Sequence, residues 1–115
     1  MSEPVIAEST FRELQDAAGA DFVAELVGTF LEEAPGMLAD LRDALAARDD
    51  ARFRRAAHSL KSNSHTFGAT KLGALAREIE LRGLDADPAR DVAALDALDV
   101  ACAQAAAALK ELSHG

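Results

Sequence analysis

Residues 22–48, FVAELVGTFLEEAPGMLADLRDALAAR, decide the fold of this chain. Apolar side chains recur in this stretch at steps of three and four, the spacing that gathers them on one face of an α-helix. The apolar stripe consists of Val23, Val27, Phe30, Ala34, Met37, Leu41 and Leu45, and it runs without a break past Pro35. We therefore expect one long helix over about 21–48, bent at Pro35. The alternative is two helices, with Pro35 in the first turn of the second, where its missing amide costs nothing.

Upstream of this stretch, the sequence predicts a short helix over about 10–18. Thr10 and Glu13 have the spacing of a capping box, in which each side chain binds the other residue's backbone amide. Gly19 can adopt the left-handed conformation that ends a helix, and Asp21 can then cap the long helix.

Downstream, three more helices are expected, over about 50–67, 70–82 and 88–112. Gly68 and Gly83 end the first two of these. Asp49 and Asp50 can cap the helix over 50–67. Asp87 can cap the helix over 88–112, with Pro88 at its first position. Their inward stripes consist of Phe53, Ala57, Leu60, Ser64 and Phe67, then Leu72, Leu75, Ala76 and Ile79, then Leu95, Leu98, Cys102, Ala105, Leu109 and Leu112.

Four amphipathic helices joined by short turns pack as an antiparallel four-helix bundle. A chain of 115 residues has room for one such domain, spanning 1–115, with the short helix covering one end. The composition is rich in Ala and Leu, has no Trp or Tyr and is 4% aromatic, which indicates an all-α fold.

The charge and the cysteine content exclude several classes of function. A formal net charge of -8 disfavours nucleic acid and anionic membranes, because both require a basic surface. Cys102 is the only cysteine, so neither an internal disulfide nor a cysteine-rich metal site can form, and a reducing cytoplasm fits the chain best. The first ten residues are acidic, and their apolar run is too short for a signal or membrane segment.

The helix expected over 50–67 has a polar stripe beside its apolar one. A turn of roughly 100° per residue places Arg54, His58, Lys61, Ser62 and His65 on this outward flank. We therefore expect His58 to be accessible to solvent. Its position alone does not indicate a function, because a single histidine on a helix is usually an ordinary residue.

Residues 56–80, AAHSLKSNSHTFGATKLGALAREIE, resemble the signature of the histidine-containing phosphotransfer (HPt) domains of bacterial multistep phosphorelays. In that family, Lys stands three positions after the histidine, and small residues, a Gly-Ala turn and a leucine-rich helix follow. The matching residues here are His58, Lys61, Ser62 and Ser64, Gly68 and Ala69, and Leu72 and Leu75. The resemblance covers roughly residues 20–82.

The resemblance implies that His58 accepts a phosphoryl group from one receiver-domain aspartate and passes it to another. It points to a Glu or Gln on the next helix as the acceptor beside Nδ1, and Glu80 matches that position. Lys61, one turn after His58, would meet the added negative charge. The implied partners are receiver domains of response regulators, a hybrid sensor histidine kinase, or both. The receiver would supply the magnesium ion and the acidic cluster, so we expect no cofactor in this chain.

Two residues depart from the family pattern. Ser62 stands where most HPt domains have Gly, and His65 stands where a small residue is usual. For His65 we favour a surface residue that shapes partner choice, over a titrating modulator or a second phosphoryl acceptor. His58 and His65 lie two turns, roughly 10 Å, apart along a helix, which is too far for one metal ion, so we expect no metal site.

Arg54 and Arg55 add positive charge on the turn before His58. They could steer the acidic pocket of a receiver domain toward the site, or they could simply pair with neighbouring acids.

Two other functions remain open from the sequence. The chain could be a phosphoryl donor domain fed by an ATP-binding kinase domain, like the first domain of chemotaxis kinases, or a helical interaction bundle that is never phosphorylated. It has no Gly-rich phosphate loop, so it cannot phosphorylate itself from ATP. We expect a monomer, because the sequence shows no obvious leftover apolar face.

Overall fold

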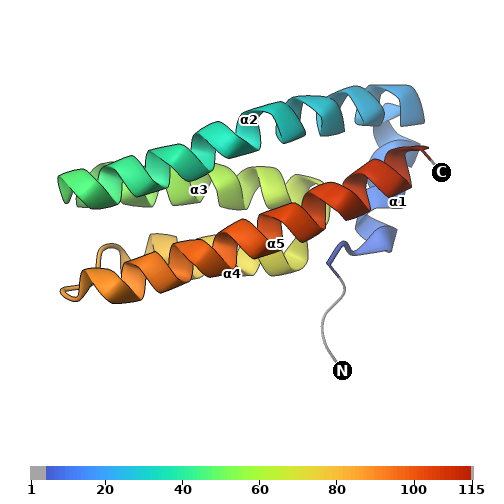
Figure 1. Ribbon diagram of the computed structural model, residues 1–115. Helices are drawn as coiled ribbons and strands as arrows, with labels where there is room; N and C mark the ends of the chain where they lie inside the picture. The colour runs from blue at the N-terminus through green and yellow to red at the C-terminus, as the bar shows by residue number, and fades with distance from the viewer. Residues whose placement is uncertain (1–4, 115) are drawn as a thin grey trace.

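The computed structural model describes residues 5–114, and all regular structure in that range is helical (Figure 1). This confirms the expected all-α class. The helices are α1 (Glu8–Ala18), α2 (Ala20–Ala47), α3 (Asp50–Thr66), α4 (Thr70–Arg82) and α5 (Pro88–His114).

The four longer helices form the expected bundle. α3 packs against α2 and α4, and α5 packs against the same two helices from the other side. α3 and α5 therefore lie diagonally opposite each other, and short turns make successive helices antiparallel. α1 crosses the end of the bundle where α2 begins and α5 ends (Figure 1).

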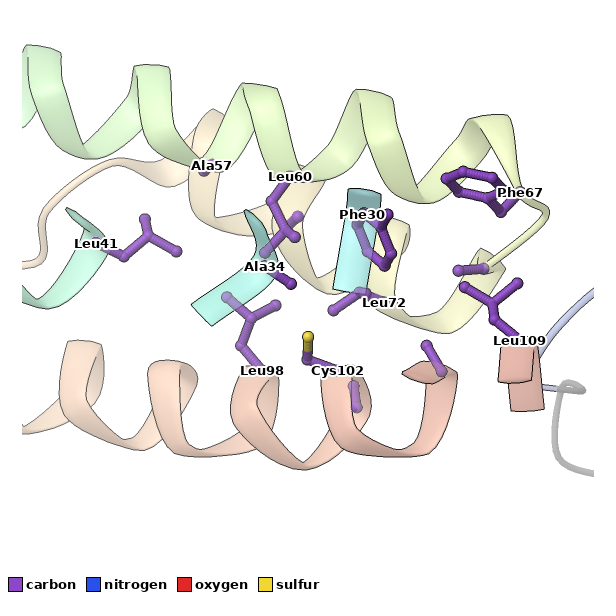
Figure 2. Close-up of a cluster of buried hydrophobic side chains, with 14 of the residues drawn as sticks. Phe30, Ala34, Leu41, Ala57, Leu60, Phe67, Leu72, Leu98, Cys102 and Leu109 are labelled. Carbon is purple, nitrogen blue, oxygen red and sulfur yellow. The ribbon is translucent and has the colours of Figure 1, made fainter. Parts of the chain in front are cut away.

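The core lies along the axis of the bundle, where apolar side chains of α2, α3, α4 and α5 converge (Figure 2). Leu41, Leu60 and Leu98 are fully buried, and each contributes about 1.5–3 kcal/mol through loss of apolar surface from water. The rings of Phe30 and Phe67 pack with centroids 5.5 Å apart, which ties α2 to the end of α3.

α2 is one continuous helix that contains Pro35 in its interior, as favoured from the stripe. A proline inside a helix costs about 3 kcal/mol relative to alanine, because one backbone hydrogen bond is lost. Pro35 itself is exposed, whereas Ala34 and Leu41 are buried on the inward face. Burial of the stripe on both sides of the proline offsets this cost.

The predicted N-caps of α1 and α2 are wrong. α1 begins at Glu8, because the amide of Ala7 donates to the carbonyl of Gly68 at 2.7 Å and so fixes the incoming chain on the turn between α3 and α4. α2 begins directly after Gly19, which has φ of 94°, so Asp21 lies inside the first turn. Neither helix has a side-chain cap.

The predicted boundaries at Asp49, Gly83 and Asp87 are confirmed, whereas α3 ends at Thr66, one residue before the predicted end, and α5 continues to His114, two residues beyond it. Asp49 caps α3 by accepting from the amide of Arg52 at 3.1 Å, and Asp87 accepts from the amide of Ala89 at 3.1 Å at the start of α5. Gly83 follows the last residue of α4.

α5 is long and apolar enough to cross a membrane, with a mean hydropathy of 1.6 over its most apolar window. One such helix is weak evidence for a membrane span, because the core helix of a bundle has the same properties, and Leu95 and Leu98 of α5 are buried in the core. However, Val92 and Val100 are 42% and 59% exposed on its outer side. Single exposed apolar residues such as these are common on monomeric proteins, so they do not test the expected monomer, which stays a prediction.

Candidate functional site

His58 lies in the middle of α3, and 59% of its side chain is exposed to solvent. Its neighbours along the helix, Ala57 and Leu60, are fully buried, and they fix which face of α3 points inward. The core stripe therefore holds the imidazole outward, as the periodicity predicts.

Glu80, in the last turn of α4, binds the imidazole of His58. Its carboxylate oxygens lie 2.9 and 3.2 Å from Nδ1 of His58. The side chain of Glu80 is only 22% exposed, because the preceding Ile79 is buried and draws this face of α4 against α3. Glu80 is thus held at the edge of the core, next to an exposed ring.

Lys61 binds the same carboxylate, with Nζ 3.1 Å from it. This hydrogen bond, more than that from His58, keeps the pKa of Glu80 below its ordinary value. Glu80 is therefore ionised at neutral pH and can only accept hydrogen bonds.

The ionised carboxylate determines the tautomer of His58. An acceptor beside Nδ1 requires the proton on Nδ1, and the neutral ring then carries its lone pair on Nε2. Among the residues that the structure describes, none makes a hydrogen bond to Nε2. His58 thus presents a free nucleophilic nitrogen on the exposed side of α3.

Arg54 lies one turn before His58 and is bound within the chain. Its guanidinium donates to the carboxylate of Asp50 at 2.8 Å and to the carbonyls of Glu80, Leu81 and Arg82 at 2.9, 3.1 and 3.2 Å. Arg55, in contrast, makes no side-chain hydrogen bond or ion pair with any described residue, and it lines a shallow hollow beside His58 and Glu80. Of the two arginines, only Arg55 keeps its charge available to another molecule.

The family model of the Hpt domain matches residues 25–114, which is most of the chain. The chain belongs to the Hpt domain family. No curated protein and no solved structure matches it. An Hpt domain takes part in histidine phosphotransfer in phosphorelays and is an intermediate there, not an autonomous enzyme.

Ser62 and His65 lie farther along α3 of this Hpt domain and do not join the His58–Glu80–Lys61 cluster. Ser62 is exposed, and its carbonyl accepts from the hydroxyl of Thr66 at 3.1 Å. The ring of His65 covers Gly73 of α4, since a Cβ placed on Gly73 would lie 2.5 Å from Cδ2 of His65. His65 therefore belongs to the packing of α3 on α4, although it is exposed.

The sequence reasoning missed Leu81, which is 64% exposed and lines the same hollow as Arg55 and His58. It could have been found from the stripe of α4, because a residue two positions after the inward Ile79 points away from the core. Within residues 5–114, the structure brings no three His, Cys, Asp or Glu side chains together in a way that could hold a metal ion.

Proposed function

We propose that this Hpt domain relays a phosphoryl group between the aspartates of receiver domains through phosphorylated His58. The observation that carries the proposal is the contact of 2.9 Å between the ionised carboxylate of Glu80 and Nδ1 of His58. In the neutral imidazole this contact places the proton on Nδ1 and the lone pair on Nε2, on a side chain that is 59% exposed.

In the transfer step, the Nε2 lone pair of His58 attacks the phosphorus of an aspartyl phosphate on the partner. The N–P bond forms as the P–O bond to the aspartate breaks, and the aspartate leaves as a carboxylate. Nδ1 keeps its proton, so the phosphorylated ring carries positive charge, which the adjacent carboxylate of Glu80 stabilises. The reverse sequence delivers the phosphoryl group to a second receiver.

Lys61 and Arg55 supply the positive charge near the transferred group. Lys61 lies one turn from His58 and already contacts Glu80, so its flexible ammonium is close to the charge that phosphorylation adds. Arg55 is uncommitted and would attract the acidic pocket of a receiver domain to a surface that also exposes Leu81. The magnesium ion and the acidic cluster belong to the receiver in this proposal, and transfer takes place in the cytoplasm.

The proposal is tested by incubating the purified protein with a set of response-regulator receiver domains that carry a labelled aspartyl phosphate. We expect the label to move to the wild-type protein and to His65→Gln, and not to His58→Gln. Undiminished labelling of His58→Gln would contradict the proposal, and loss of label in His65→Gln alone would assign the acceptor to His65. Failure of every receiver to label the wild type would favour an unphosphorylated interaction bundle.

A further inference from the structure

The last turn of α4 ends in carbonyl groups that have no partner within the helix. Arg54 of α3 binds three of them, the carbonyls of Glu80, Leu81 and Arg82, at 2.9–3.2 Å. The planar guanidinium has five N–H donors, so it can bind several carbonyl oxygens at once. One residue of α3 thus holds the backbone of the turn that contains Glu80.

Asp50 braces Arg54 and also holds the chain beyond α4. One of its carboxylate oxygens accepts from Nε of Arg54 and the other from the amide of Leu84, both at 2.8 Å. These two hydrogen bonds, with that of Leu84 the stronger influence, keep the pKa of Asp50 below its ordinary value. Asp50 and Arg54 therefore grip the chain on both sides of Gly83.

Gly83 allows this close approach. Its φ of 69° and ψ of -159° lie in a region that essentially only glycine populates. A Cβ at this position would also overlap the guanidinium of Arg54 and the carboxylate of Asp50. The loop after α4 is thus shaped around the Asp50–Arg54 pair.

We propose that Arg54, braced by Asp50, is a positioning residue that sets where the carboxylate of Glu80 meets His58. Arg54 and His58 are four residues apart on one face of α3, so they contact the same residue of α4 at two points. Arg54 binds the backbone carbonyl of Glu80 at 2.9 Å, and Nδ1 of His58 binds its carboxylate at 2.9 Å. Fixing the backbone limits the positions that the carboxylate can reach, and through it the tautomer of His58. The role in transfer rests on the proposed function of His58.

A purely structural role would make Arg54 a cap of α4 whose loss lowers stability and nothing else. The two roles differ in what happens to the imidazole of His58 in the folded protein. A positioning residue acts on the tautomer, which the ¹⁵N chemical shifts of Nδ1 and Nε2 report directly. A mere cap leaves these shifts unchanged while the melting temperature falls.

The test compares Arg54→Gln with Arg52→Gln, a matched control on the same helix whose guanidinium binds the exposed Asp40 instead. At a pH where His58 is neutral, we expect the wild type and Arg52→Gln to show a protonated Nδ1 and a bare Nε2. In Arg54→Gln, both shifts should move toward the average of the two tautomers. The phosphohistidine of Arg54→Gln should decay faster, or form more slowly, by about tenfold, the lower end of the roughly 10- to 100-fold loss seen when a residue that orients a ligating histidine is replaced.

Arg54→Lys and Asp50→Asn keep the test decisive if Arg54→Gln does not fold. Lys at position 54 keeps the positive charge but lacks the planar guanidinium with its several donors, and Asn at position 50 removes the charged acceptor of Arg54. Each variant should therefore shift the tautomer ratio of His58 in the same direction as Arg54→Gln, by a smaller amount. Wild-type ¹⁵N shifts in all folded variants would overturn the proposal, even if their melting temperatures fall. If the wild-type protein accepts no phosphoryl group from any receiver domain, the proposed function is contradicted instead. The ¹⁵N shifts would still decide the role of Arg54.

Discussion

Two carboxylates, Glu80 near the end of α4 and Asp91 near the start of α5, are both bound by basic residues, yet they differ in environment. Glu80 is 22% exposed and meets an exposed imidazole. Asp91 is fully buried, accepts from the amide of Asp85 at 2.9 Å, and has Arg48 and Arg82 at 3.7 and 3.9 Å. Within the described residues, its Oδ1 has no hydrogen-bond partner.

The difference separates chemistry from structure. Glu80 touches a nucleophilic ring at the surface, where a partner can reach it. Asp91 holds the loop over 83–87 against the end of the bundle, where no partner can touch it. Loss of the first should change transfer and leave the fold intact, and loss of the second should do the reverse.

The largest effect is expected from Glu80→Ala. The bundle should stay folded, because Glu80 lies at the edge of the core, but transfer to His58 should slow by about 10- to 100-fold as the ring loses its acceptor. Transfer kinetics and the lifetime of the phosphohistidine measure this, with melting temperature as the control. An unchanged rate and lifetime would show that the carboxylate does not act on the ring.

Asp91→Ala should give the opposite result. It removes the acceptor of the Asp85 amide, and such a hydrogen bond to a charged group contributes about 1.5–3 kcal/mol. The two arginines are about half exposed and can turn to solvent, so the lower end of this range is expected. Urea unfolding measures the change. A transfer rate that falls as far as that of Glu80→Ala, in protein that is still folded, would break the comparison.

Acid should reduce the stabilisation that the Asp50–Arg54 pair gives to the end of α4 and the loop after it. The pKa of Asp50 is lower in the folded protein than its ordinary value, so the folded state binds fewer protons than the unfolded state in this range. The stabilisation is therefore complete above about pH 4–5 and is lost as the pH falls through the unfolded pKa toward the folded one. The free energy of unfolding should therefore fall less between neutral and acidic pH in Asp50→Asn than in the wild type. Equal slopes would contradict the role given to Asp50.

The smallest effect is expected from Gly73→Ala. Alanine gains up to about 1 kcal/mol in helix propensity, but its Cβ must push the ring of His65 aside. The gain in unfolding free energy should therefore be smaller in the wild type than in a His65→Ala background. The same gain in both would show that the ring does not contact Gly73.

The fold could be predicted from the sequence because each helix carries its own apolar stripe. In the His58–Glu80–Lys61 cluster, the accessibility of His58 could be predicted from the apolar stripe of α3. The roles of Lys61 and Glu80 were predicted from the resemblance to Hpt domains. The ion pair of Arg54 with Asp50 is the pairing with a neighbouring acid that the sequence left open. Its hydrogen bonds to α4 could not be predicted, since those acceptors are backbone carbonyls that reach it only when α4 packs on α3. The predicted start of α1 was wrong for the same reason, because the hydrogen bond between Ala7 and Gly68 joins distant parts of the chain.

The central claim is that Nε2 of His58 carries the phosphoryl group, and ¹H–³¹P correlation NMR of the phosphorylated protein tests it most directly. Phosphorus on Nε2 couples to both carbon-bound ring protons, whereas phosphorus on Nδ1 couples to Hε1 alone. We predict correlations from one phosphorus to both ring protons of His58, and none in His58→Gln. A correlation to Hε1 alone, or to the ring of His65, would contradict the account.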